Sequence, residues 1–291
     1  MTAMRDPIRL LAIDLDGTLL QPDGRVAARD AAAVRMARDA GIDVVIATGR
    51  AIIESQSALD AIGREGAFIG AGGAILNDAI SDATLDRATM PAEVVTSLVD
   101  CLISHGHAAH LLKDADRCGY DYAIIGQGAL NPATEWWFRT FPVRVRHFAR
   151  LEDDEHPHET VRCGTVAHET SLSAVVQQIR DDIGDGILLQ HWEAVTESAA
   201  LGVRTHLLEA FSPGVDKWWM LERYAQQRGI GPAAIAAIGD GLNDVSMVRE
   251  AGLGIAMANA SPAVMHVADQ VTVSNSEAGV AAAISTILAN V

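Results

Sequence analysis

At both ends of the chain, short apolar runs alternate with segments that carry a helical pattern. The apolar runs have the length expected for strands buried on both faces of a parallel sheet. The predicted strands are residues 8–13, 42–47, 67–70, 205–209, 235–238, 254–257 and 270–273, and the predicted helices are residues 29–40, 51–62, 216–228, 244–250 and a last one from Glu277. This alternation predicts an α/β fold with a doubly wound parallel sheet.

The pattern changes between residues 87 and 202. Helices are predicted at residues 91–104 and 172–182, and short β-like runs at residues 110–112, 120–125, 143–148, 160–167 and 187–192. We therefore predict an inserted α+β domain at residues 87–202 with an antiparallel sheet, and a first domain formed by residues 1–86 and 203–291. Residues 151–160 are predicted to form a solvated surface loop.

Composition narrows the classes of partner. The 291 residues carry 38 Asp and Glu against 22 Lys and Arg, a formal net charge of −16, which argues against nucleic acid or an anionic membrane surface. The three cysteines form no CxxC pair, and no signal-peptide or membrane-spanning pattern is seen, so we expect a cytoplasmic protein, a monomer or small homo-oligomer.

Two aspartates directly follow the first predicted strand. In an extended backbone Asp14 and Asp16 point to the same side, while Leu15 turns back into the core. Gly17 lets the chain leave the sheet sharply. Two neighbouring carboxylates repel, so they need a cation or a raised pKa. The alternative is an ordinary solvated turn rich in Asp.

Two further groups of polar residues lie at predicted strand ends. Thr48-Gly49-Arg50 follows the strand at 42–47, at the start of a helix where an anion is readily bound. Asp240, Asn243 and Asp244 follow the strand at 235–238. Simple structural explanations compete with these, because Thr48 can satisfy its own turn and Asp244 can cap the helix that it starts. We interpret Arg50 as a structural or surface charge.

Lys217 lies in the first turn of a predicted helix. The chain has only two lysines, Lys113 and Lys217, and carries nearly all its positive charge on Arg. A compact ammonium is not replaceable by a guanidinium at a crowded centre, so this lysine is a candidate for chemistry. The alternative is an ordinary surface position.

These motifs, in this order, resemble the haloacid dehalogenase superfamily of phosphatases, and most of all its Cof-type branch, subclass IIB. The resemblance covers DLDGTLL from Asp14, ATGR from Ala47, Lys217 after SPGVD, GDGLNDVSM from Gly239, and the later GLGIAMANA and SNSEAGV. It implies a core of the predicted α/β type and a large α+β cap between the second and third motifs.

The resemblance also implies roles for these residues. Asp14 would be the nucleophile that takes the phosphoryl group, and Asp16 the acid and then the base. Thr48, Gly49 and Asn243 would contact the phosphoryl group. Lys217 would balance charge, with Asp244 in support. The expected cofactor is Mg²⁺, held by Asp14, the backbone carbonyl of Asp16, and Asp240, because Mg²⁺ prefers oxygen ligands.

The sequence therefore predicts a Mg²⁺-dependent phosphatase acting on a small phosphorylated metabolite, such as a sugar phosphate, through an aspartyl-phosphate intermediate. One alternative is a phosphomutase or phosphotransferase on the same fold. Another is a non-catalytic protein that binds a phosphorylated metabolite, which the complete carboxylate set disfavours. The substrate itself is not identified, because specificity would lie in cap loops that carry no motif.

Several residues depart from the family pattern or remain open. Ala71-Gly72-Gly73 stands where the family often has Asn before Gly-Ala, and Trp218-Trp219 follows the lysine where Gly is usual. Tyr120, Tyr122 and Trp136-Trp137 are interpreted mainly as cap core, the alternative being that one contacts substrate. His105-Gly106-His107 and His156-Pro157-His158 lack the nearby Cys or regular His spacing of a metal site.

Overall fold

The protein is described here from a computed structural model that covers residues 7–193 and 205–289. The chain forms two compact units, one of residues 1–85 and 216–291 and the other of residues 86–215. In the two described ranges, every helix is too short or too polar to cross a membrane.

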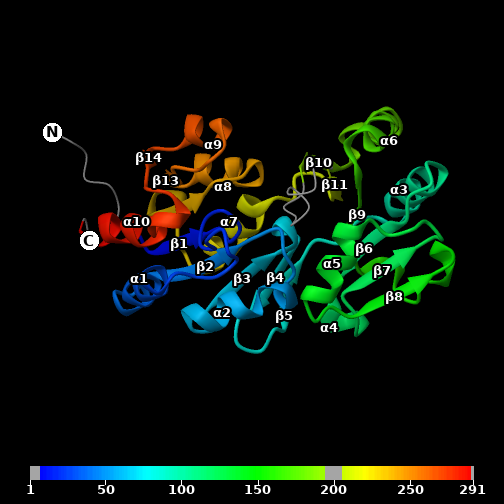
Figure 1. The fold of residues 1–291 in the computed structure, drawn as a ribbon. Helices are drawn as coiled ribbons and strands as arrows, with labels where there is room; N and C mark the ends of the chain where they lie inside the picture. Colours follow the sequence, from blue (N-terminus) through cyan, green and yellow to red (C-terminus); the bar gives the residue numbers. More distant parts are fainter. Residues whose placement is uncertain (1–6, 194–204, 290–291) are drawn as a thin grey trace. The chain divides into compact units, whose positions relative to one another are not determined.

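The first unit contains an eight-stranded sheet in the order β14-β13-β12-β1-β2-β3-β4-β5 (Figure 1). The pairs from β14 to β3 are parallel, and β4 turns back antiparallel to β3. The strands are β1 (Leu10–Ile13), β2 (Asp43–Ala47), β3 (Ala67–Gly70), β4 (Ile75–Asp78), β5 (Thr84–Arg87), β12 (Ile235–Gly239), β13 (Leu253–Ala256) and β14 (Gln270–Val271).

Helices cover both faces of this sheet. Their bounds are α1 (Ala28–Asp39), α2 (Gln56–Ile62), α7 (Lys217–Gln227), α8 (Val245–Glu250), α9 (Pro262–Val267) and α10 (Gly279–Leu288). Leu11 and Ile13 pack in the apolar cluster that includes α1, α2 and α10, whereas Leu10 and Ala12 pack in the cluster that includes α7 and α8. Neighbouring residues of β1 therefore face opposite layers, which confirms the predicted doubly wound α/β fold.

Segments from the two ends of the chain meet in this unit. β1 lies between β2 and β12, with Ile13 level with both Ile46 and Ile238. The red helix α10 lies beside the blue helix α1 in Figure 1, and the buried Asp30 of α1 accepts a hydrogen bond of 2.7 Å from the backbone N–H of Ala281. Because the three strands are parallel, the residues that follow β1, β2 and β12 lie at one edge of the sheet.

The second unit is an α+β domain with a six-stranded sheet in the order β10-β11-β9-β6-β7-β8. All pairs are antiparallel except β7 with β8. Helices α3 and α6 pack on one face. The elements are α3 (Ala92–Ser104), β6 (Ala109–Lys113), α4 (Ala115–Cys118), β7 (Tyr122–Ile125), α5 (Pro132–Thr140), β8 (Val145–Phe148), β9 (Thr160–His168), α6 (Glu169–Ile183), β10 (Leu188–Glu193) and β11 (Thr205–Phe211).

The strand predicted at residues 205–209 does not belong to the first unit. It is β11, which pairs with β9 on one side and β10 on the other, so the second unit ends after Val215 rather than after Gly202. A short apolar run indicates a strand but carries no information about which sheet receives it. The expected end at Gly202 itself lies outside the described residues.

The segment at residues 151–160 is not simply a solvated loop. Asp154 is buried and accepts hydrogen bonds from the ammonium of Lys113 at 2.5 Å and from the hydroxyl of Tyr120 at 2.7 Å. Lys113 also donates to Thr160 Oγ1 at 2.7 Å. Burial opposes the charge of Asp154, but the hydrogen bonds from Lys113 and Tyr120 prevail and lower its pKa. A buried ion pair therefore anchors this segment to the sheet.

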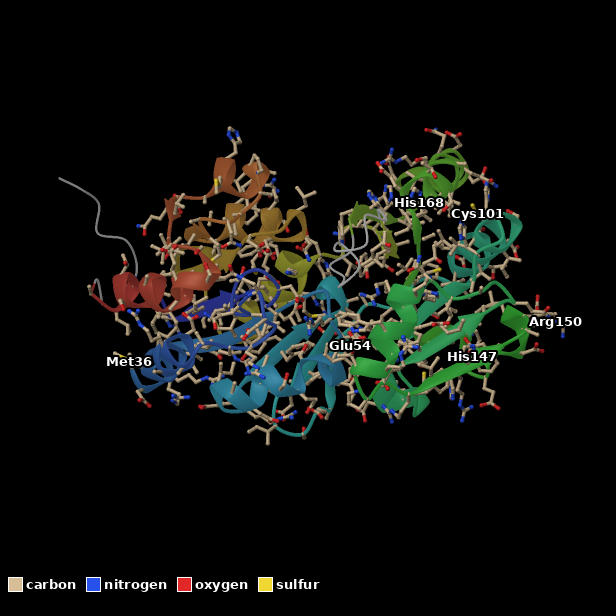
Figure 2. All side chains as sticks on the ribbon, in the orientation of Figure 1. Met36, Glu54, Cys101, His147, Arg150 and His168 are labelled. Atoms are coloured by element: carbon tan, nitrogen blue, oxygen red, sulfur yellow. The ribbon has the colours of Figure 1, made fainter. Side chains whose placement is uncertain are left out.

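Of the aromatic residues predicted as cap core, the two tyrosines are core, whereas Trp136 and Trp137 are half-buried. Tyr120 and Tyr122 are buried, and the Tyr122 hydroxyl accepts a hydrogen bond from Arg162 at 3.0 Å. The histidines of this unit differ in burial: the labelled His147 and His168 in Figure 2 are exposed, whereas His110 is half-buried. Among the described residues, the one group of three or more His, Cys, Asp or Glu side chains placed to share a metal ion contains no histidine.

The buried ion pair of Lys113 and Asp154 predicts that one isosteric substitution will strongly destabilise the protein. Asp154→Asn keeps the side-chain volume but leaves the Lys113 ammonium buried without its carboxylate, so the free energy of unfolding should fall by about 3–5 kcal/mol. The neighbouring Glu155 pairs with Arg146 at 2.9 Å on the surface, and Glu155→Gln should cost less than about 1 kcal/mol. Urea unfolding followed by circular dichroism measures both. Equal losses would show that the Asp154 contact is no stronger than a surface pair.

Candidate active site

Asp14 lies at the carboxyl end of β1, fixed by the sheet on both sides of its backbone. Its N–H donates to the carbonyl of Ile238 at 3.0 Å, which continues the pairing of β1 with β12. Its own carbonyl accepts from the N–H of Leu19 at 3.2 Å, so the chain folds back directly after the strand. The Asp14 carboxylate is 4% exposed, which leaves little water to solvate its charge.

Lys217 supplies the compensating charge. It is the first residue of α7, whose start is capped by the Asp216 carboxylate accepting from the N–H of Trp219 at 2.8 Å. Its fully buried ammonium donates to Asp14 Oδ1 and to Asp244 Oδ1, both at 2.6 Å. Burial alone would lower its pKa, but the charges of Asp14 and Asp244 outweigh burial and raise it, so Lys217 stays protonated.

Asp244 holds the turn that follows β12. Its Oδ2 accepts from the backbone N–H groups of Asp240 at 3.0 Å and Gly241 at 2.9 Å, while its Oδ1 binds Lys217. The side chain therefore organises the Asp240–Gly241 turn, and no cap hydrogen bond to helix α8 is formed by it. This residue links β12 to α7 as well as placing Asp240.

Asp14, Asp240 and Asp244 form a compact acidic group. One carboxylate oxygen from each lies within 4.8 Å of the others. Burial and the charge of Asp244 raise the pKa of Asp14 well above its usual value and that of Asp240 to about 6, although Lys217 acts in the opposite direction on both. One ammonium does not balance three carboxylates, and the set of hard oxygen donors suits a divalent cation such as Mg²⁺.

Thr48 and Asn243 lie at the neighbouring strand ends. Thr48 is buried, and its Oγ1 accepts from the N–H of Arg50 at 3.2 Å, so it does satisfy its own turn as the simpler explanation required. A hydroxyl that accepts such a bond still has a proton to donate. Asn243 lies beside Gly49, since a Cβ on Gly49 would be 3.8 Å from Asn243 Nδ2. The three predicted phosphoryl-contacting residues are thus neighbours.

Asp16 is bound by a residue that the sequence analysis did not assign to the site. Arg50 Nε donates to Asp16 Oδ2 at 2.8 Å, and Arg50 Nη2 donates to Asp16 Oδ1 at 2.5 Å. We had interpreted Arg50 as a structural or surface charge, but its side chain is 15% exposed and faces the site. The available signal was its place directly after Thr48-Gly49, at a helix start where the site was already expected.

Other residues missed from the sequence shape the loop after β1. Thr18 is buried and its hydroxyl donates to Asp240 Oδ1 at 2.9 Å. Asn259 donates to the carbonyl of Gly17 at 2.8 Å, and Asn275 donates to that of Leu20 at 2.8 Å. The late SNSEAGV motif, which includes Asn275, therefore supports the loop that carries Asp16.

The unusual Ala71-Gly72-Gly73 sequence has a backbone role. The Ala71 N–H donates to the carbonyl of Arg50 at 2.9 Å, and the Gly72 N–H donates to that of Thr48 at 2.9 Å. Gly73 has φ +106°, and a Cβ there would lie 1.9 Å from the carbonyl oxygen of Asp216. The absence of a side chain at Gly73 lets this loop reach the start of α7, where Lys217 lies.

All the predicted site residues thus lie at one edge of the first unit's sheet. The structure brings the carboxylates of Asp14, Asp240 and Asp244 together around Lys217, and it directs the Asp16 carboxylate to Arg50 instead. The chemical roles assigned to these residues remain predictions.

A family model described as haloacid dehalogenase-like hydrolase matches residues 11–284. The chain therefore belongs to this family, which confirms the resemblance seen in its motifs. It is an enzyme of the hydrolase class.

Individual proteins similar to this chain indicate which kind of hydrolase it is. The chain is 26% identical over 279 residues to the 5-amino-6-(5-phospho-D-ribitylamino)uracil phosphatase YcsE of Bacillus subtilis (strain 168), covering 95% of this chain and 94% of that protein. A haloacid dehalogenase-like hydrolase from Bacteroides thetaiotaomicron has a TM-score of 0.79 at 25% identity, covering 96% of this chain and 99% of that one. The HAD subclass IIB sugar phosphatase BT4131 shares the fold, with a TM-score of 0.76 at 21% identity over 97% of this chain and 100% of that one. The named phosphatases support phosphoric monoesters as the substrates of this hydrolase.

The loop after β1 predicts a contrast between two glycines. Gly17 and Gly24 have nearly the same backbone, φ +79° and +78°, but a Cβ on Gly17 would lie 2.2 Å from Asp240 Oδ2, whereas Gly24 has nothing within 4 Å. Gly24→Ala should cost about 1–2 kcal/mol from backbone strain alone. Gly17→Ala should cost more and should also displace Asp240. Urea unfolding and Mg²⁺-dependent thermal shifts measure the two effects, and equal behaviour of the variants would contradict the crowding at Gly17.

Proposed function

We propose that this hydrolase is a Mg²⁺-dependent phosphatase that cleaves a small phosphorylated metabolite through an aspartyl-phosphate on Asp14. The observation that carries the proposal is the pairing of a buried carboxylate at a strand end with a buried ammonium, 2.6 Å from Asp14 Oδ1 to Lys217 Nζ. Lys217 favours the ionised form of Asp14 against the effect of burial, and it offsets the charge that a phosphate brings.

In the first half of the reaction, a carboxylate oxygen of Asp14 attacks phosphorus as the bond from phosphorus to the ester oxygen breaks. We propose that Asp16 donates the proton that the departing oxygen receives. In the second half, Asp16 takes a proton from water, the water oxygen attacks phosphorus, and the bond to Asp14 breaks. Phosphate leaves, Asp14 is again a carboxylate, and Asp16 again carries the proton. Thr48, Gly49 and Asn243 are placed to contact the phosphoryl oxygens.

Asp14 and Asp240 offer carboxylate oxygens to the ion, with the backbone carbonyl of Asp16 as the third proposed ligand. When bound, Mg²⁺ supplies positive charge that favours both the ionised Asp14 and the phosphate oxygens. The raised pKa values of Asp14 and Asp240 support this assignment, since burial and the charge of Asp244 raise both, and a cation bound beside the two carboxylates would oppose both causes. Asp244 is kept in place by Lys217 and two backbone N–H groups, so we assign it a supporting role.

We propose that the second unit acts as the cap that selects the substrate. The four groups of predicted site residues all lie outside residues 86–215, so the chemistry needs nothing from that unit. The similar proteins are named for different substrates, a ribitylaminouracil phosphate for YcsE and sugar phosphates for BT4131. We therefore expect a small phosphate ester as the substrate. Neither nucleic acid nor a membrane is expected as a partner.

The function is tested by hydrolysis of a panel of phosphorylated metabolites and p-nitrophenyl phosphate, with phosphate release as the measurement. Release from at least one ester, with a kcat/KM well above that for phosphopeptides, is expected. Transfer of the phosphoryl group to a second sugar without phosphate release would instead reveal a mutase. Binding of esters without either reaction would indicate the non-catalytic alternative.

The nucleophile assignment predicts the effect of an isosteric change. Asp14→Asn should abolish turnover, because an amide does not attack phosphorus. Asp16→Asn should reduce kcat by about 10²–10⁴-fold through loss of proton transfer. Steady-state hydrolysis measures both, with the exposed Asp39→Asn on α1 as a matched control. Substantial activity in folded Asp14→Asn protein would refute the assignment.

The metal assignment predicts a requirement for a hard cation. EDTA should stop hydrolysis, and Mg²⁺ rather than Zn²⁺ should restore it, because all the proposed ligands are oxygens. Mg²⁺ should raise the melting temperature of the wild type, since a ligand that binds the folded state stabilises it. Asp240→Ala should lose this shift and need far more Mg²⁺ for activity than Asp244→Ala. Full activity after complete metal removal would overturn the proposal.

A further inference from the structure

The contact between Arg50 and Asp16 is a two-point ion pair. Two different nitrogens of the guanidinium, Nε and Nη2, donate to the two different oxygens of the carboxylate, at 2.8 and 2.5 Å. Such a pair fixes the direction of a carboxylate as well as its charge, because the planar fork of Arg matches both oxygens at once. The Asp16 side chain is 37% exposed and lies on the turn at Gly17, so packing alone does little to hold it.

Arg50 is itself held from several directions. Its N–H donates to Thr48 Oγ1 at 3.2 Å, its carbonyl accepts from Ala71 N–H at 2.9 Å, and its Nη1 donates to the carbonyl of Glu54 at 3.3 Å. Gly70 permits this arrangement, since a Cβ there would lie 2.9 Å from the Arg50 carbonyl oxygen. The ends of β2 and β3 and the short 3₁₀ helix η1 (Ile52–Ser55) thus fix one guanidinium against Asp16.

The guanidinium carries its charge in this setting. Burial alone would lower its pKa, but the hydrogen bonds and charge of Asp16, with smaller contributions from Glu54 and Asp14, raise it. The contribution of Asp14 shows that the same cation also acts on the proposed nucleophile. Arg50 is therefore a fixed element of the site and not a mobile surface charge.

Building on the proposed function, we propose that Arg50 is the positioning residue for Asp16. It aims the Asp16 carboxylate so that, in the second half of the reaction, one oxygen can take a proton from water, and its positive charge favours the ionised, proton-accepting form of Asp16. Proton transfer needs a heavy-atom approach of about 2.6–3.2 Å, and a displacement of about 1 Å can cost about 10²-fold. Attack by Asp14 on phosphorus uses no proton from Asp16. Loss of Arg50 should therefore slow the proton transfer from water, and with it hydrolysis of the aspartyl-phosphate, and spare the attack by Asp14.

The choice of ester separates these steps. p-Nitrophenolate is a good leaving group that needs no protonation, whereas an alkyl or sugar phosphate has a poor one. In Arg50→Ala, kcat for a sugar phosphate should fall by about 10²-fold. With p-nitrophenyl phosphate, the first turnover should still release p-nitrophenol in a rapid burst, within about threefold of the wild-type rate. The following steady state should be slow, because Asp16 is no longer aimed at water.

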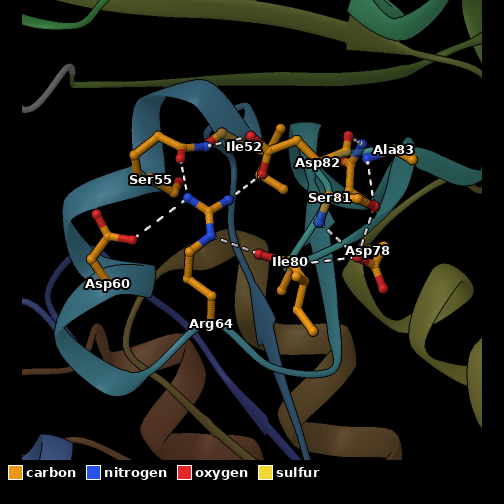
Figure 3. Close-up of polar contacts among 12 residues, drawn as sticks. Ile52, Ser55, Asp60, Arg64, Asp78, Ile80, Ser81, Asp82 and Ala83 are labelled. Carbon is orange, nitrogen blue, oxygen red and sulfur yellow. Dashed lines mark hydrogen bonds and ion pairs between the residues drawn. The ribbon is translucent and has the colours of Figure 1, made fainter.

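A matched control lies in the same unit. Arg64 also forms a multiple contact, with Asp82, Gln56 and the carbonyl of Ala79, and none of these partners is a proposed site residue (Figure 3). Arg64→Ala should leave both the burst and the steady state unchanged once differences in stability are allowed for. Arg50→Lys should recover less than a tenth of the activity lost, because an ammonium holds one oxygen rather than two. Added guanidinium at millimolar concentration should partly restore Arg50→Ala.

Three outcomes would overturn the positioning role. They are equal losses for both esters together with loss of the burst, full activity of Arg50→Lys, and no effect of Arg50→Ala on the sugar phosphate. If Arg50→Ala does not fold, Arg50→Lys carries the same comparison of burst and steady state. A wild type that hydrolyses neither ester would overturn the proposed function, and this inference with it.

Discussion

The buried ammonium of Lys217, shared at 2.6 Å by Asp14 and Asp244, is the contact on which the rest of the site depends. It joins the end of β1, the start of α7 and the turn after β12, three segments far apart in the chain. A buried carboxylate without such a partner would be neutral at physiological pH and could not attack phosphorus. The close approach at Gly73 and the cap at Asp216 both follow from the need to bring the start of α7 to this point.

Much of this arrangement was predictable, because parallel strands place their carboxyl ends at one edge of a sheet. The sequence alone therefore predicts that the motifs after β1, β2 and β12 lie close together. The place of Arg50 after Thr48-Gly49 indicates that it lies near the site, but its partner Asp16 is not predictable, since a side chain's partner depends on its rotamer and on the loop after β3, neither of which a pattern reports. The scarcity of lysine in this chain does not by itself identify a residue of the site. Lys113 is equally scarce and equally buried, yet its partner is Asp154 in the second unit.

The second unit was harder to predict for a related reason. Its short strands carry no periodicity that says which sheet receives them, so β11 was expected in the first unit. The loop at residues 151–160 looked solvated because its charges are dense. The structure shows that, of the carboxylates in this segment, Asp154 is the one that is buried and pairs with Lys113. In each case a long-range pairing decided what local composition could not.

The position of β1 between β2 and β12 has a consequence for how the protein is made. β1 is synthesised early and its neighbour β12 only from residue 235 onward, so one edge of β1 has no partner strand through most of synthesis. The second unit, being continuous in the chain from residue 86 to 215, has all its strands before then. When it folds first, it draws the two halves of the first unit toward each other and shortens the loop that must close. Folding of the inserted unit then favours closure of the sheet on which the candidate site is built.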